Sequence, residues 1–241
     1  MERLYRVIRG IKRSQGNKFK KPQRIPITPT LLTQLGHNLW NSSRPFQDKL
    51  MLWAAMLTAF HGFLRVSEYT ASHVGKFNHS TTLCFNNINI IATDCISIHI
   101  KASKTDPFRI GTTLHLFSNN SPLCPVSALT HYLSSRQNKT GPLFQWHDGR
   151  FLTRSNLAAA IKKIKPPHII NMSSHSFRIG AATTAAAAGF PRWLIQALGR
   201  WNSNCYRQYI RIPQHTLQSV SESLTRHWPI PSVPFDPDNI Q

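Results

Sequence analysis

Apolar side chains change their spacing twice along the chain, from a helical period to alternation and back to a helical period. Thr28 and Pro29 suit the N-cap and first turn of a helix that is expected to run to about Leu39. A longer, largely buried helix is expected after Pro45. Isoleucines then alternate with polar residues, which predicts three short strands in a small antiparallel sheet. The strands are expected at residues 88–91, 96–100 and 110–117.

The remainder of the chain has helical spacing and carries the residues that start and end helices. Gly189 and Gly199 stand where helix C-caps belong, Pro191 suits a helix start, and Pro213 ends a helix. Together with the sheet, this pattern predicts an α+β fold that is mainly α-helical. The expected helices cover residues 125–136, 153–164, 174–188, 191–198, 203–211 and 215–227.

The excess of basic over acidic residues indicates what kind of molecule the protein binds. The 241 residues include 29 Lys and Arg against 9 Asp and Glu, so the formal net charge is +20. Because 41% of the residues are hydrophobic, the chain can also form a sizeable core. A folded, strongly basic protein indicates a polyanionic partner such as nucleic acid. Composition alone leaves a ribosomal or a membrane-surface protein as alternatives.

Other features of the sequence bear on location and cofactors. No signal-peptide run and no apolar stretch long enough to span a bilayer is present, so a soluble intracellular protein without a membrane partner is expected. The four cysteines lack metal-ligand spacing and predict reduced thiols. No metal and no cofactor is expected. The basic run over residues 12–24 fits either a nuclear import signal or a DNA-facing linker.

Several cationic residues stand where they can contact a phosphate. Arg65 follows the buried helix, and Glu68, three residues later, can orient it. His175 and Arg178 lie in the first turn of a predicted helix and share one face. Lys104 is at the turn between two predicted strands. Taken singly, each has an ordinary explanation, such as a surface pair or a solvated helix end, and only their joint occurrence favours a site.

In this order and with these separations, the residues resemble the motifs of the tyrosine recombinase (phage-integrase-like) family. That family carries an Arg in a G-L-R-x-x-E segment, a Lys on a β-hairpin, H-x-x-R at a helix start, L-G-H/W, and a Tyr about ten residues after that Gly. The resemblance covers roughly residues 25–215, and its last part looks most like recombinases of eukaryotic crypton and DIRS-type mobile elements. The matching residues here are Gly62-Phe63-Leu64-Arg65-Val66-Ser67-Glu68, Lys104, His175, Arg178, Leu198-Gly199 and Tyr209.

The resemblance implies a DNA breaking-rejoining catalytic-core fold and a reaction that needs neither metal nor ATP. Arg65 and Arg178 would clamp the phosphate that is attacked. Tyr209 would form a covalent 3′-phosphotyrosine, with His175 as the acceptor or orienter of its proton. Lys104 would give a proton to the departing 5′ oxygen.

Two positions of the motif leave a choice. The family's His/Trp position directly follows the Gly, and this chain has Arg200 there, which is expected to support the site. We expect Trp201, one residue later, to take the role, because an indole can pack against the nucleophile helix and donate its one N–H. Tyr206 and Tyr209 could share a helical face, and the spacing from Gly199 favours Tyr209 as the nucleophile.

The same resemblance divides the chain. Residues 1–26 are expected to be the remnant of an N-terminal core-binding domain with its linker, residues 27–228 the catalytic domain, and residues 229–241 a Pro-rich tail. The expected partner is double-stranded DNA. A monomer in solution should assemble into a dimer or tetramer on DNA, and a eukaryotic host would place it in the nucleus.

Three other functions fit parts of the pattern. One is a relic of a mobile element that binds DNA without cutting it, which the short N-terminal region favours and the complete set of motif residues disfavours. A type IB topoisomerase shares the chemistry, but the Ala-rich helix after H-x-x-R looks more like a recombinase. A helical adaptor with a basic face would not need the mixed α/β order.

Overall fold

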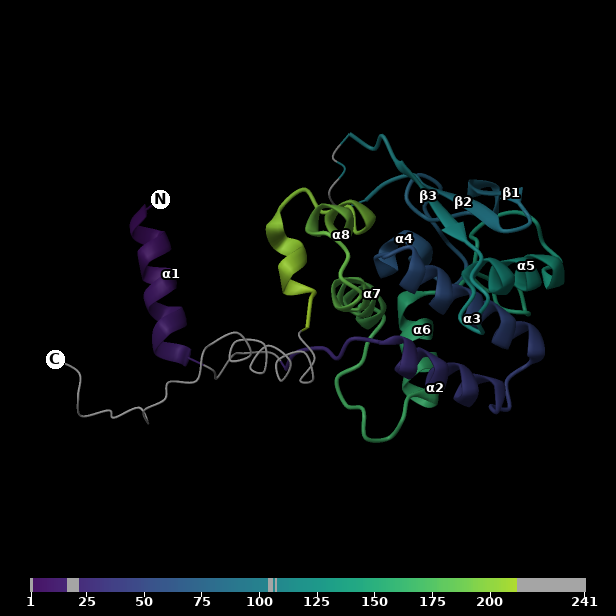
Figure 1. The fold of residues 1–241 in the computed structure, drawn as a ribbon, viewed down its shortest axis with the longest axis horizontal. Coiled ribbons are helices and arrows are strands. Elements are labelled where there is room, and N and C mark those ends of the chain that lie inside the picture. The colour runs from purple at the N-terminus through teal and green to yellow at the C-terminus, as the bar shows by residue number, and fades with distance from the viewer. Residues whose placement is uncertain (1, 17–21, 104–105, 107, 212–241) are drawn as a thin grey trace, which may run out of the picture.

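The structure is a computed structural model that describes residues 2–16, 22–103, 106 and 108–211 (Figure 1). The expected helix 215–227, the tail 229–241 and Lys104 lie outside the described residues. The elements are α1 (Glu2–Gln15), α2 (Pro29–Trp40), α3 (Phe46–His61), α4 (Val66–Tyr69), η2 (Phe85–Asn87), β1 (Ile88–Ala92), β2 (Cys95–Ile100), β3 (Thr112–Phe117), α5 (Pro125–Ser135), α6 (Arg154–Ile164), α7 (Ser176–Ala187), α8 (Arg192–Leu198) and η3 (Asn204–Gln208).

Two helices start at threonine caps, of which Thr28 was predicted as a cap. The Thr28 hydroxyl accepts a hydrogen bond from the backbone N–H of Leu31 at 3.4 Å, with Pro29 in the first turn of α2. Thr153 caps α6 in the same way, through the N–H of Asn156 at 3.2 Å. These side chains satisfy N–H groups that a helix cannot pair internally. The helices predicted from residues 28 to 198 are confirmed, with ends that differ by one or two residues.

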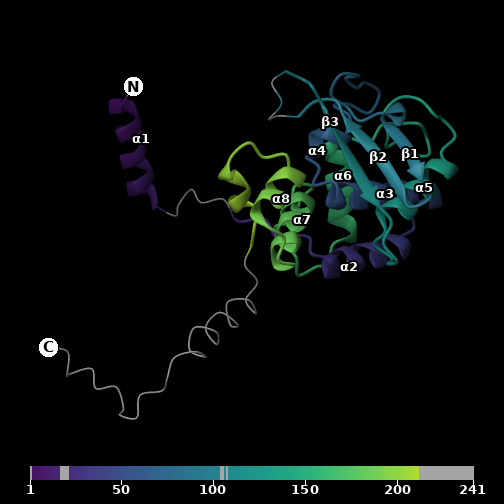
Figure 2. The same ribbon diagram turned by 45° about the horizontal axis from the view of Figure 1, so that its top comes forward.

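The predicted antiparallel sheet is confirmed, with the order β1-β2-β3 (Figure 2). Ile98 of the central strand pairs with Ile88 on one side and with Leu114 on the other. β2 is buried along most of its length, whereas Ile90 and Ile91 of the edge strand are exposed. The sheet therefore packs on the helical layer mainly through β2.

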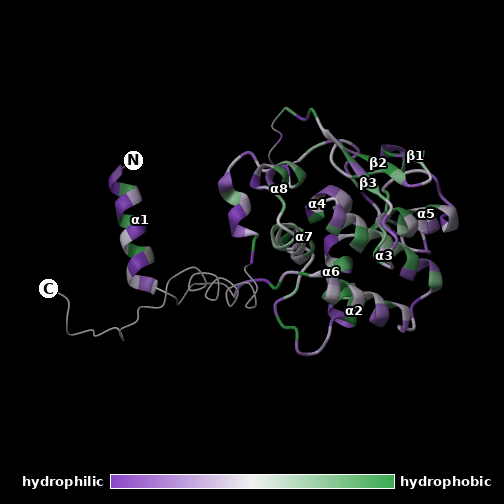
Figure 3. Ribbon diagram, in the orientation of Figure 1, coloured by the Kyte–Doolittle hydropathy of each residue, from purple (hydrophilic) through white to green (hydrophobic). Residues whose placement is uncertain are grey.

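α3 is the centre of the core, because its side chains are buried on nearly all sides, from Met51 to Phe60. Contacts join it to α5 on one side and to α7 on another. α1 is the opposite case. It carries both hydrophobic and hydrophilic residues (Figure 3), and its described side chains are all exposed, including Leu4 and Ile8.

The prediction of a helix over residues 203–211 is wrong. The structure has a short 3-10 helix, Asn204–Gln208, and Tyr209 follows it as the first residue after its end. Ser203 caps this turn through the N–H of Cys205. Ser and Asn favour such local side-chain bonds over helix continuation, and the segment has no long apolar stripe to support a longer helix.

Candidate active site

Arg65 is held by the carboxylate of Glu68 at the start of α4. The Arg65 backbone N–H donates to Glu68 Oε2 at 2.8 Å, and its guanidinium lies 3.0 Å from Oε1. Glu68 is buried, and the Arg65 side chain is 14% exposed. The segment can turn here because Phe63 has a φ of +50°. A carboxylate that closes on both backbone and side chain fixes the direction of this guanidinium.

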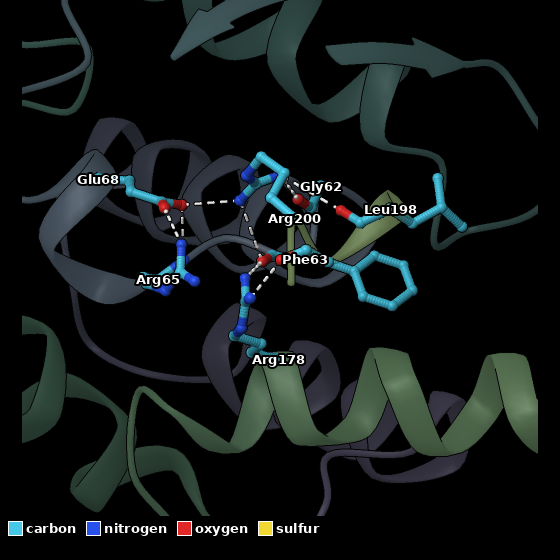
Figure 4. Close-up of polar contacts among 8 residues, drawn as sticks. Gly62, Phe63, Arg65, Glu68, Arg178, Leu198 and Arg200 are labelled. Atoms are coloured by element: carbon cyan, nitrogen blue, oxygen red, sulfur yellow. Dashed lines mark hydrogen bonds and ion pairs between the residues drawn. The ribbon is translucent and has the colours of Figure 1, made fainter. Parts of the chain in front are cut away.

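Arg200, which is far from Glu68 in the sequence, contacts the same carboxylate. Its guanidinium lies 2.8 Å from Glu68 Oε2, and it also donates to the carbonyls of Gly62 at 3.1 Å and Phe63 at 3.3 Å (Figure 4). Glu68 therefore joins two guanidiniums whose residues are far apart in the sequence. Arg200 was expected to support the site, and here it ties the segment after α8 to the turn before α4.

Arg178 is completely buried, which the sequence did not indicate. One of its terminal nitrogens donates to the carbonyl of Phe63 (Figure 4), and the other donates to the carbonyl of Gly199. Desolvation by burial lowers the pKa of its guanidinium, and the charges of Arg65 and Arg200 lower it further. The side chains of Arg65 and Arg178 lie near each other beside Phe63 (Figure 4), but the Arg178 guanidinium is covered in this arrangement.

The cover consists of aromatic rings. The Arg178 guanidinium carbon lies 4.3 Å from the ring centre of Trp201 and 5.7 Å from that of Tyr209. The ring centres of Trp201 and Tyr209 are 4.9 Å apart, and the centre of the His175 ring lies 5.2 Å from that of Tyr209. The expected nucleophile, the H-x-x-R pair and Trp201 thus form one contiguous group.

Trp201 packs as expected, but its N–H does not bond as expected. The indole is buried against Phe63 and Tyr209, and its Nε1 has no hydrogen-bond partner among the described residues. Tyr206 is also buried and lies farther from the indole, at 6.3 Å between ring centres. Tyr209 is the more accessible of the two tyrosines.

His175 is half-buried at the start of α7. Desolvation by burial lowers its pKa to about 4, and the charges of Arg24, Arg178, Arg154 and Arg65 act in the same direction. The ring is therefore neutral at pH 7. A neutral imidazole can accept a proton from a phenol, whereas a protonated one cannot.

Sequence reasoning missed two of these cations, Arg24 and Arg154. Residues 25–27 run beside the loop that carries His175, since Ile25 N–H donates to the carbonyl of Asn171 at 3.0 Å and Ile27 N–H to that of Ser176 at 3.1 Å. This brings Arg24 close to the ring. Nothing in the motif marks Arg24 or Arg154, because both come near His175 only through the tertiary fold.

Metal-ligating side chains and membrane-spanning helices are two further features that the structure allows to be checked. In the described part of the chain, no three His, Cys, Asp or Glu side chains group as metal ligands would. Among the same residues, no helix combines the length and apolar character that a bilayer crossing requires. Lys104, the expected proton donor, belongs to the residues that the structure does not describe.

Comparisons of sequence and of structure give different results. No protein-family model and no curated protein matches the chain. Among solved structures, the XerH site-specific recombinase bound to a palindromic difH substrate aligns with a TM-score of 0.57 and 15% identity, over 84% of this chain and 54% of that one. The XerA recombinase aligns with a TM-score of 0.54 and 16% identity, over 87% of this chain and 67% of that one.

A Flpe mutant in a DNA Holliday junction complex aligns with a TM-score of 0.52 and 15% identity, over 92% of this chain and 56% of that one. This chain thus spans about half the length of the XerH and Flpe chains. At these identities the likeness concerns the fold. The described domain has the fold of tyrosine recombinase catalytic domains, mainly helical with a small three-stranded antiparallel sheet.

Proposed function

We propose that this domain cleaves and rejoins double-stranded DNA through a covalent 3′-phosphotyrosine at Tyr209. The observation that carries the proposal is the contact of Tyr209 with His175, Trp201 and Arg178 in one group. These residues come from α7 and from the segment after α8, and no core packing requires a neutral His beside a tyrosine ring and a buried guanidinium. The solved structures of similar fold include a recombinase in a post-cleavage complex with its DNA substrate.

Two guanidiniums supply the positive charge for the phosphate. Arg65 is partly exposed and fixed by Glu68, so it can meet a non-bridging oxygen without rearrangement. Arg178 lies beneath Trp201 and Tyr209, so these rings must move off it before it can contact the same phosphate. Each fixed donor of this kind lowers a barrier by about 3 kcal/mol.

The proton transfers follow from the groups beside the tyrosine. The Tyr209 oxygen attacks the phosphorus, the bond from phosphorus to the 5′ oxygen breaks, and the phenolic proton goes to His175. Lys104 protonates the 5′ oxygen, an assignment that rests on the resemblance. The phosphodiester becomes a phosphotyrosine ester, so rejoining to another 5′ hydroxyl needs no ATP.

Further expectations belong to this proposal. Monomers would assemble into a dimer or tetramer on DNA, and residues 1–26 and 229–241 would flank a catalytic domain of residues 27–228. A relation to crypton and DIRS-type elements and a nuclear location rest on the resemblance and on the basic run. The net charge of +20 supports DNA as the partner.

The test is the capture of the covalent intermediate. The substrate is a pool of nicked duplexes of random sequence. Cleavage near the nick releases a short fragment that carries the free 5′ hydroxyl, so rejoining is prevented and the covalent protein–DNA adduct accumulates. The adduct is quantified on a denaturing gel. We expect an adduct with the wild-type chain and none with Tyr209→Phe. DNA binding without any adduct would indicate a silent DNA-binding relic. Relaxation of plasmids without a preferred site would indicate a topoisomerase instead.

A further inference from the structure

A recess of about 670 Å³ opens beside α4, the short helix that follows Arg65. Ser67 of α4 lines one wall, and the start of α6 lines another. The hydrogen bond from Ala71 N–H to the carbonyl of Leu152, at 2.8 Å, holds these walls together. Most residues that line the recess carry a hydroxyl, including Ser67, Thr70, Thr81, Thr82, Thr153 and Ser155.

The charge that lines the recess is positive. Arg154 is the only charged residue that lines it in the described part of the chain, and no carboxylate does. The Arg154 side chain is exposed, and no hydrogen bond or ion pair joins it to another described residue. By contrast, Arg150 is paired with Asp148 at 2.7 Å. An unpaired cation in a wall without acids favours an anionic ligand.

Neutral hydrogen-bond donors accompany this cation. The hydroxyls of Ser67 and Thr81 have no partner among the described residues, whereas Thr70 donates to the carbonyl of Val66. Hydroxyls of Ser and Thr together with Arg are the side chains that commonly bond the phosphates of nucleic acids. These hydroxyls and Arg154 are spread over the recess, so they suit an extended phosphodiester backbone better than one small ion.

The recess also adjoins the proposed active site. Ser67 is two residues from Arg65, on the same turn of chain. The charge of Arg154 reaches the His175 ring, where it is one of the causes of that residue's lowered pKa. One strand of duplex DNA carries a phosphate every ~3.4 Å of helix axis, so a strand that enters the site must place further phosphates beside it.

We propose that this recess binds a phosphodiester of the DNA backbone next to the one that is cleaved, with Arg154 as its cation and Ser67 and Thr81 as its neutral donors. The proposal rests on the proposed function, because it takes DNA as the substrate. It adds a contact that positions the strand without taking part in bond breaking.

The test measures binding in a Tyr209→Phe background, so that cleavage does not contribute. The probe is a fluorescent duplex of random sequence, titrated between ~50 and ~200 mM salt. Each phosphate contact contributes about 0.9 to the slope of log K against log salt, so Arg154→Gln should reduce the slope by about that amount. Ser155→Asp places an acid at the mouth of the recess and should weaken binding; an acid in the first turn of α6 favours the helix, so this variant should fold.

Lys163→Gln is the matched control. Lys163 is exposed at the opposite end of α6, about 13 Å from Arg154 along the helix axis. We expect it to leave the slope unchanged. An equal loss in Lys163→Gln and Arg154→Gln, or an unchanged slope in Arg154→Gln, would overturn the proposal.

A second probe separates DNA from a free anion. Inorganic phosphate is added to the Tyr209→Phe parent and to its Arg154→Gln variant, and their melting temperatures are compared. If phosphate stabilises only the parent, while both chains give the same slope of log K against log salt for the duplex, the recess binds a free anion and the proposal is wrong. If the Tyr209→Phe parent does not bind the duplex at all, the proposed function fails with it. If that parent binds and only the Arg154 effect is missing, the recess alone is refuted.

Discussion

His175 should remain neutral far below the pH at which an ordinary histidine protonates. Its pKa is lowered to about 4 from the ordinary value of 6.5, first by desolvation and then by the charges of Arg24, Arg178, Arg154 and Arg65. The acid groups around it do not offset these charges, since the buried carboxylate of Glu68 is engaged by two guanidiniums.

The sign of the effect on stability follows from this difference. The unfolded chain binds a proton at His175 near pH 6.5, and the folded chain does so only near pH 4. Stability is therefore lost as the pH falls from about 6.5 to about 4, and His175 has no effect above that window. At 1.36 kcal/mol per pH unit the loss is at most about 3.4 kcal/mol. The ring is only half-buried, so solvent screening reduces this to roughly 1–2 kcal/mol.

The assay compares urea denaturation of the wild type and His175→Gln at pH 7.5 and pH 4.5. Taking the difference between the two pH values cancels the cost of the substitution itself. We expect the wild type to lose roughly 1–2 kcal/mol more than His175→Gln over this interval. Equal losses, or a His175 proton resonance that titrates near the ordinary value, would contradict the lowered pKa of His175. Bound DNA should raise the pKa of His175, because a phosphate adds negative charge beside it.

Other predictions test the tyrosine, the carboxylate and the packing. Tyr209→Phe should abolish the adduct on a denaturing gel and leave DNA affinity nearly unchanged, while Tyr206→Phe should retain the adduct. Glu68→Gln leaves two guanidiniums without their buried carboxylate and should cost about 3–5 kcal/mol in urea denaturation. A Cβ at Gly180 would lie 1.9 Å from the carbonyl oxygen of Ile27, so Gly180→Ala should lower the melting temperature and expose the linker to proteolysis. Adduct formation should survive excess EDTA, since guanidiniums supply the positive charge; its loss would indicate metal-dependent cleavage.

The fold was predictable from the sequence where local patterns decide it. Alternating isoleucines located β2, and Thr28 and Thr153 marked two helix starts, because a cap acts within one turn. The error at residues 203–211 arose because the predicted helix begins with Ser203 and Asn204, two residue types that favour local side-chain bonds over helix continuation.

The sequence predicted which residues gather at the candidate site, but it did not predict how deeply each of them is buried. The i, i+3 spacing places His175 and Arg178 on one face of α7, and it does not say how far below the surface that face lies. Arg178 is completely buried and His175 is half-buried, and the rings of Trp201 and Tyr209 lie over the Arg178 guanidinium. That cover comes from a segment more than 20 residues away, as the contact of Arg178 with the Gly199 carbonyl shows.

The backbone after α8 bears on the choice between Arg200 and Trp201. Arg200 has a φ of +53°, in the left-handed region that ends helices and reverses the chain. The reversal folds the Trp201 ring back over Gly199, where even an added Cβ would lie 1.7 Å from it. Trp201 therefore lies against Tyr209, while Arg200 points to Glu68. We infer that the one-residue delay separates two tasks, with Trp201 packing against Tyr209, the proposed nucleophile, and Arg200 holding Glu68. Gly199→Ala should then displace the indole and impair both.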